Sequence, residues 1–205
     1  MTTYSSLKYN HPFSSNATGT GSLTLISSQT ASASASISFT SGIDSTYDEY
    51  VFKFINIHPS VDDASFQFNM STDNGSNYNV IKTTSWFQAY TSEDTGGGNL
   101  SYDGNADLAQ STSYQPISRE AGVGVSGANS DDSLSGYIYL FAPSSTTYVK
   151  HFLGVNNYIY SGGETNSFNN FLGGYANTTS AINAIDFKFS SGNIDDGTIL
   201  MYGVK

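Results

Sequence analysis

The sequence contains no cysteine, which excludes a disulfide, a thiolate metal site and a cysteine nucleophile. Arginine occurs once, at Arg119, and 17 acidic residues against 7 basic ones give a net charge of -10. A chain of this charge repels phosphate backbones and anionic lipid headgroups, so we expect neither nucleic acid nor a membrane as a partner. Charged residues make up 12% of the chain, a low share that suits shells, fibres and polar recognition faces better than an ordinary cytosolic enzyme.

Long apolar runs are also missing. No stretch approaches the roughly 18 consecutive apolar residues that indicate a transmembrane helix. The N-terminal segment lacks a basic stretch followed by an apolar core, so no signal peptide is expected. We therefore expect synthesis in a cytoplasm, with lysis or a dedicated route carrying the protein out of a cell if it acts outside one.

Aromatic residues are plentiful, with 15 Tyr, 13 Phe and 1 Trp in 205 residues. Such side chains bury large areas and favour pleated, half-buried surfaces. Twenty Gly and four Pro fit many short turns better than a rigid linker. The length suits one large β-sandwich or barrel, and no internal repeat points to a solenoid or a propeller.

Apolar residues recur with the period of two that is typical of strands. Asp73-Asn74-Gly75 has the composition of a hairpin turn, so residues 47–84 are expected to form two or three consecutive antiparallel strands. Residues 92–107 are rich in Gly, Asp and Asn and are expected to form a long loop. The segments with a strand pattern are 23–26, 33–39, 50–57, 66–70, 78–84, 134–141, 148–160, 185–189 and 199–204.

About nine or ten strands follow from this pattern. They predict an all-β protein: an antiparallel β-sandwich, jelly-roll-like, in a single domain over residues 23–205. Residues 1–22 show no sustained period and are expected to form an extended N-terminal arm, although a partly ordered terminus is the alternative. Four apolar side chains of this arm are candidates for contact with a neighbouring subunit: Tyr4, Leu7, Tyr9 and Phe13.

Two segments have a distinctive texture. Within Tyr47–Tyr78, an aromatic-rich strand ends in Asn56-Ile57-His58-Pro59 and a second aromatic strand leads to Ser71-Thr72-Asp73-Asn74-Gly75. The sequence ends in Gly197–Lys205, which reads GTILMYGVK. Both segments resemble small β-sandwich virion structural proteins, of the decoration or fibre-like kind, from tailed phages of marine and aquatic bacteria. The resemblance covers about 40 residues directly and the rest by composition and strand order.

This resemblance implies a phage virion structural protein that works by assembly and is located on the exterior of the particle. A capsid decoration or cement protein is one form, and a homo-oligomer that contacts other virion proteins is expected, with a trimer favoured because such proteins occupy symmetric positions. The alternative is a receptor-binding module of a tail or head fibre that recognises host-surface carbohydrate. The family supplies no catalytic residues.

The residues themselves point to no enzyme and no cofactor. There is no G-x-S-x-G motif, no phosphate-binding loop and no carboxylate pair in a telling position. His58 with Asp62 and Asp63 lacks the spacing of a zinc site, so a histidine packed under a loop is the favoured interpretation over a metal or acid–base cluster. Asp195 and Asp196 are weak candidates for calcium ligands. The alternative is that they occur here because aspartate side chains stabilise turns through bonds to the backbone.

Aromatic side chains provide the remaining candidates for ligand binding. Trp86 with Phe87 and Tyr90, and Tyr158 with Tyr160, are candidates for a platform on which sugar rings stack. Packing in the core or against another subunit is the commoner fate of aromatic residues in strands, and we weigh it as the alternative.

Overall fold

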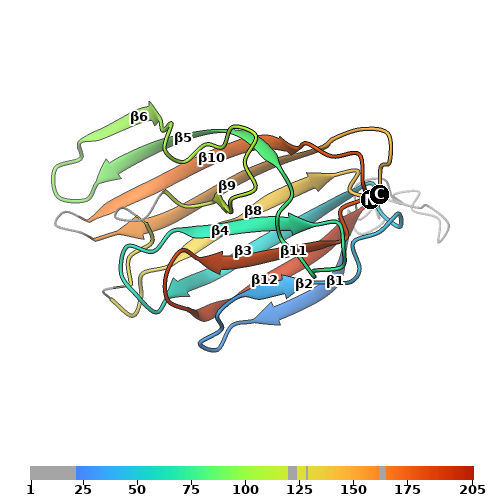
Figure 1. Ribbon diagram of the computed structural model, residues 1–205. Helices are drawn as coiled ribbons and strands as arrows, with labels where there is room; N and C mark the ends of the chain where they lie inside the picture. Colours follow the sequence, from blue (N-terminus) through green and yellow to red (C-terminus); the bar gives the residue numbers. More distant parts are fainter. Residues whose placement is uncertain (1–21, 120–123, 128, 162–164) are drawn as a thin grey trace, which may run out of the picture.

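The computed structural model describes residues 22–119, 124–127, 129–161 and 165–205. These residues form twelve strands in two antiparallel sheets. The larger sheet has eight strands (Figure 1), in the spatial order β1 (Leu23–Thr30), β12 (Ile194–Val204), β3 (Glu49–Pro59), β8 (Leu134–Phe141), β9 (Lys150–Tyr160), β10 (Asn166–Ala176), β5 (Lys82–Ser92) and β6 (Gly98–Tyr102).

The smaller sheet has four strands and packs on one face of the larger one, which we call the inner face (Figure 1). Its spatial order is β2 (Ile37–Phe39), β11 (Ala184–Phe189), β4 (Phe66–Ser71) and β7 (Gln115–Pro116). No helix of the described residues is long and apolar enough to cross a membrane. The predicted antiparallel β-sandwich is confirmed.

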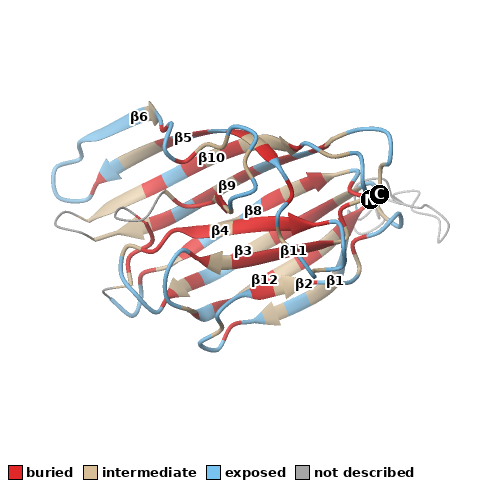
Figure 2. Ribbon diagram, viewed as in Figure 1, coloured by how far each residue is buried: buried red, intermediate tan, exposed pale blue. Residues whose placement is uncertain are grey.

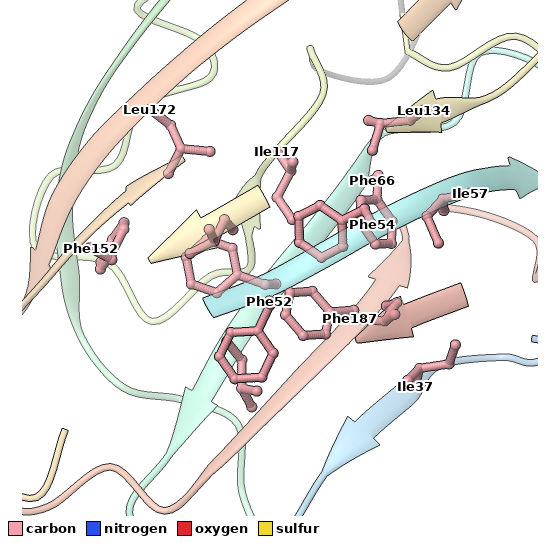
Figure 3. Close-up of a cluster of buried hydrophobic side chains, with 14 of the residues drawn as sticks. Ile37, Phe52, Phe54, Ile57, Phe66, Ile117, Leu134, Phe152, Leu172 and Phe187 are labelled. Carbon is pink, nitrogen blue, oxygen red and sulfur yellow. The ribbon is translucent and has the colours of Figure 1, made fainter. Parts of the chain in front are cut away.

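The core lies between the sheets and is built largely from phenylalanine. Phe52 and Phe54 of β3 point inward because they alternate with the outward-facing Val51, Lys53 and Ile55. Figure 3 shows these rings around Phe187 of the small sheet, and the rings of Phe54 and Phe187 are 5.2 Å apart. Edge-to-face and tilted pairs of this kind add to the stabilisation that comes from burying the rings.

Figure 2 shows that burial is uneven across the sandwich. Strands β4 and β11 of the small sheet are buried along most of their length, whereas β6, at one edge of the large sheet, is largely exposed. One reason is that β4 and β11 are central in the small sheet and face the large one. On their other face, Asn69 and Asp186 are covered by the segment between β5 and β7, where the Thr112 carbonyl and the Tyr114 hydroxyl bond to them. Strand β6 pairs with β5 alone and extends beyond the small sheet.

Polar side chains fill the inner face where β7 crosses it. Asn156 donates from Nδ2 to the carbonyl of Ile117 at 2.7 Å, and Asn170 donates from Nδ2 to Oδ1 of Asn156 at 3.2 Å. Thr84 donates to Oε1 of Gln115 at 2.6 Å. These buried polar groups lie within a core that continues to Phe168 and Tyr158.

Three expectations about the strands were wrong in detail. The turn at Asp73-Asn74-Gly75 does not close a hairpin, because β4 lies in the small sheet and β5 in the large one. The segment expected to be a long loop, residues 92–107, contains β6. Strand β10 was not foreseen, and it pairs over its whole length with β9 and β5.

The jelly-roll form of the sandwich is not confirmed. A jelly roll folds eight strands into two sheets through two Greek keys, whereas eight strands lie in one sheet here and four in the other.

Candidate functional site

The outer face of the large sheet, which the small sheet does not cover, is rich in exposed apolar side chains. Alternation along the strands places these residues on this face, and register places them beside one another across neighbouring strands. Contiguous exposed apolar surface of this kind marks an interaction site. The exposed large side chains of the outer face are Leu23, Leu25, Ile55, Phe87, Leu100, Tyr102, Tyr137 and Leu153.

Aromatic rings link these side chains across the outer face. The rings of Phe87 and Phe171 are stacked with centroids 4.9 Å apart, and Tyr137 and Tyr139 make an edge contact at 5.4 Å. On the neighbouring strands β3 and β12 of the same face, the Nζ atom of Lys53 lies 5.3 Å from the centre of the Tyr202 ring. The outer face is therefore a preformed and ordered surface instead of a set of isolated exposed side chains.

A groove on the outer face lies toward one end of β5, β8, β9 and β10 and has a volume of about 620 Å³. It exists because Gly173, which faces outward on β10, has no side chain, while Phe141, Leu153 and Tyr175 rise beside it. A Cβ at Gly173 would lie 3.0 Å from a methyl group of Leu153. The groove is mainly apolar and fits an apolar side chain from outside.

Charge is sparse on the outer face. In the eight strands of the large sheet, the Asp, Glu, Lys and Arg residues are Glu49, Lys53, Lys82, Lys150 and the pair Asp195 and Asp196. Lys82 and Lys150 are buried, and the aspartates lie at the first residues of β12. Glu49, the first residue of β3, also lies at a strand end, so Lys53 remains as the charged residue in the middle of the face.

A second candidate site lies on the inner face of the large sheet, beyond the small sheet and next to β6. We call it the Phe168 pocket, and its volume is about 440 Å³. Strands β5, β6, β9 and β10 and the segment after β7 supply its lining. The lining residues are Gln88, Tyr90, Asn99, Ser101, Arg119, Tyr160, Asn166 and Phe168.

The aromatic part of this pocket surrounds Phe168. Tyr90 stacks on Phe168 with centroids 5.1 Å apart, and Tyr158 stacks on it at 5.2 Å with the ring planes 10° from parallel. Tyr160 meets Phe168 edge-on at 6.1 Å. Tyr90 and Tyr160 are half-buried and line the pocket, whereas Tyr158 is fully buried and supports the cluster from below.

The polar part of this pocket contains the arginine of the sequence. Nε of Arg119 donates to Oδ2 of Asp103 at 2.9 Å, and this carboxylate is largely buried. Gln88 is 4% exposed and donates weakly from Nε2 to Ser101 at 3.4 Å, while its Oε1 atom has no hydrogen-bond partner.

The five aromatic candidates from the sequence are not all brought together, and Phe87 lies exposed on the outer face. Tyr90, Tyr158 and Tyr160 converge on Phe168, which the sequence did not single out. Trp86 is fully buried in the core and does not line the pocket, so its ring is not placed where a ligand can stack. Arg119 and Gln88 were missed as site residues, because nothing in their local sequence marks them.

The acidic and histidine candidates lie near one another at the start of β12. Asp195 and Asp196 line a hollow with His58, whose Nδ1 atom is 2.5 Å from the carbonyl oxygen of Asp132. Among the described residues, no group of three or more His, Cys, Asp or Glu side chains is arranged to hold a metal ion. Calcium binding at Asp195 and Asp196 stays a prediction.

Asp62 and Asp63 do not join His58 in a cluster. Asp62 accepts hydrogen bonds from the Ser126 hydroxyl and the Gly127 amide, and burial raises the pKa of Asp63. The contact candidates of the arm, Tyr4, Leu7, Tyr9 and Phe13, fall outside the described residues.

Comparison with known proteins adds no identification. No protein-family model matches the chain, and neither the curated proteins nor the solved structures gave a match.

Proposed function

We propose that this chain is a structural protein of the exterior of a phage particle, a capsid decoration or cement protein or a related surface component, and that it works by assembly. Copies join through the outer face of the large sheet. The observation that carries the proposal is this face itself, a sheet surface of eight strands that displays aromatic and aliphatic side chains to solvent.

The charge distribution favours a second copy of the chain as the occupant of the outer face. Each copy carries a net charge of -10, so two copies repel one another wherever their carboxylates approach. The middle of the outer face has Lys53 as its charged residue and Glu49 at its end, so it brings few carboxylates together. Burial of its apolar side chains supplies the driving force.

The groove beside Gly173 adds a place for a side chain of the neighbouring copy. Apolar anchors that enter pockets carry much of the binding energy of an interface. Tyr137 and Leu153 project from the same face and are suited to act as apolar anchors of this kind. Two outer faces packed on each other form a two-fold pair, whereas the trimer favoured from the sequence needs contact with a different patch of the next copy.

The virion part of the proposal is supported by the resemblance of Tyr47–Tyr78 and Gly197–Lys205 to phage structural proteins, and by the low charge of the chain. It is tested by raising antibodies against the purified protein and imaging immunogold-labelled particles from the phage that encodes it. Label at regular positions on the particle surface is the expected result. Particles that never carry the protein, although it is abundant in the lysate, would overturn the virion assignment.

A further inference from the structure

The Phe168 pocket opens on the inner face of the large sheet, on the opposite side from the proposed assembly surface. Gln88 and Tyr90 point to this side because they alternate along β5 with Phe87 and Ala89, which belong to the outer face. The pocket therefore stays accessible when copies join through the outer face.

An unsatisfied acceptor is built into the pocket wall. Gln88 is 4% exposed and Oε1 has no partner, although a buried polar atom without a hydrogen bond destabilises a fold by about 1–3 kcal/mol. Rotating the side-chain amide by 180° does not remove this defect, because Nε2 would then take the place of Oε1 and lack a partner. Oε1 itself has almost no accessible surface, so a ligand that donates a hydrogen bond satisfies this atom once the Gln88 side chain shifts toward the pocket.

Hydrogen-bond donors line the same pocket. Arg119 uses Nε for Asp103, and among the described residues its Nη groups have no acceptor. The ion pair with Asp103 balances the guanidinium charge, and the chain as a whole is strongly acidic. The pocket therefore presents N–H donors without a net positive charge, which favours a neutral hydroxylated ligand over an anionic one.

The aromatic side chains of the pocket suit the apolar C–H face of a hydroxylated ring. Tyr90 and Tyr160 line the pocket and are held in place by contacts with Phe168. The C–H face of a pyranose ring packs on an aromatic ring, while its hydroxyls both donate and accept hydrogen bonds. The volume of about 440 Å³ lies within the range of roughly 300–1,000 Å³ that is usual for small-molecule sites.

We infer that the Phe168 pocket binds a neutral hexose residue of a glycan, with Tyr90 and Tyr160 packed against the sugar ring and Gln88 and Arg119 bonded to its hydroxyls. The assignment does not depend on how the protein assembles. It narrows the sugar-stacking expectation from the sequence to one pocket and removes Trp86 from it.

The first test is binding of the purified full chain to a printed array of neutral and acidic oligosaccharides. A neutral glycan that binds is then titrated against Tyr160→Ala and Gln88→Met, each checked for an intact fold by circular dichroism. Each variant should weaken binding about tenfold or more, the loss expected for one stacking contact or one hydrogen bond. Tyr148→Ala removes an exposed tyrosine far from the lining residues and serves as the matched control.

The second test needs no variant, because Arg119 is the single arginine of the chain. Phenylglyoxal modifies arginine, and an adduct located on Arg119 by peptide mass mapping reports on this pocket alone. The bound neutral glycan should slow modification several-fold, whereas a glycan that does not bind on the array should leave it unchanged. Three results would overturn the inference: no glycan binds, acidic glycans bind in place of neutral ones, or binding leaves Arg119 modification and both variants unaffected.

Discussion

Lys82 donates a hydrogen bond of 2.6 Å from Nζ to Oδ1 of Asn69 in the interior of the protein. The lysine has no exposed surface, and its second bond goes to the carbonyl of Val80 at 2.8 Å. None of the described carboxylates pairs with it. Burial without a counter-ion disfavours the charged form and lowers the pKa of Lys82 to about 7.

The first prediction concerns the pH dependence of stability. In the unfolded chain Lys82 keeps its proton up to about pH 10, so between pH 7 and pH 10 the unfolded state binds more protons than the folded state. The free energy of unfolding should therefore rise with pH in this window, and this group alone should contribute about 2 kcal/mol between about pH 7 and pH 9. Urea denaturation at a series of pH values measures the rise.

The variant Lys82→Met isolates this contribution. It removes the amine and keeps an unbranched side chain, while Oδ1 of Asn69 retains its bond from the Met70 amide. The pH dependence between pH 7 and pH 9 should flatten relative to the parent protein. Burial also lowers the pKa of Lys150, but that contribution is common to both proteins. Equal slopes in the two proteins would show that Lys82 is not buried as an unpaired amine.

The second prediction concerns the phenylalanine core. The ring of Phe187 lies between 5.2 and 6.3 Å from five other phenylalanine rings, those of Phe39, Phe52, Phe54, Phe66 and Phe68. Phe187→Ala should lower the free energy of unfolding by about 3–5 kcal/mol, because it opens a cavity between the sheets. Tyr148→Ala, at an exposed loop position, should change it by less than about 0.5 kcal/mol. Denaturation with urea compares the two, and similar small losses would contradict this description of the core.

The third prediction orders two changes at the Arg119–Asp103 pair. Arg119 is 29% exposed and Asp103 8%, so water reaches a guanidinium that has lost its partner more easily than it reaches the carboxylate. Arg119→Met should therefore destabilise the fold by about 2 kcal/mol and Asp103→Asn by about 1 kcal/mol. The reverse order in chemical denaturation would show that the carboxylate is better hydrated than its burial indicates.

The sequence predicted the sandwich because the core strands alternate cleanly. Phe66, Phe68 and Met70 point to the core and are separated by polar residues, and Ile185, Phe187 and Phe189 follow the same rule. Strand β10 escaped prediction because Asn170 faces the interior, where it bonds to Asn156. An asparagine at an inward position breaks the apolar alternation, and its partner is 14 residues away.

The candidate site was predicted in part for a similar reason. Tyr158 and Tyr160 lie on one face of a recognisable strand, so their proximity could be inferred from the period of two. Tyr90 joins them through the β5–β10 pairing, which no local pattern reveals. Burial of Trp86 and the position of Arg119 depend on which strands the small sheet covers, and this is a property of the whole fold.

The fourth prediction addresses the proposed assembly surface. Leu153 is 56% exposed on the outer face and lines the groove beside Gly173. Leu153→Glu would bury a new carboxylate between copies that are already acidic, and should weaken association by about two orders of magnitude. Val61→Glu makes the same change at a loop position that is 39% exposed and away from this face, and should leave association unchanged.

Sedimentation of the parent protein and of these two variants over a range of concentrations tests the central claim, that copies assemble through the outer face, most directly. We expect an oligomer for the parent and for Val61→Glu, and a single chain of 21.9 kDa with an unchanged circular dichroism spectrum for Leu153→Glu. A parent protein that sediments as a single chain at every concentration, or an oligomer that Leu153→Glu leaves intact, would contradict it.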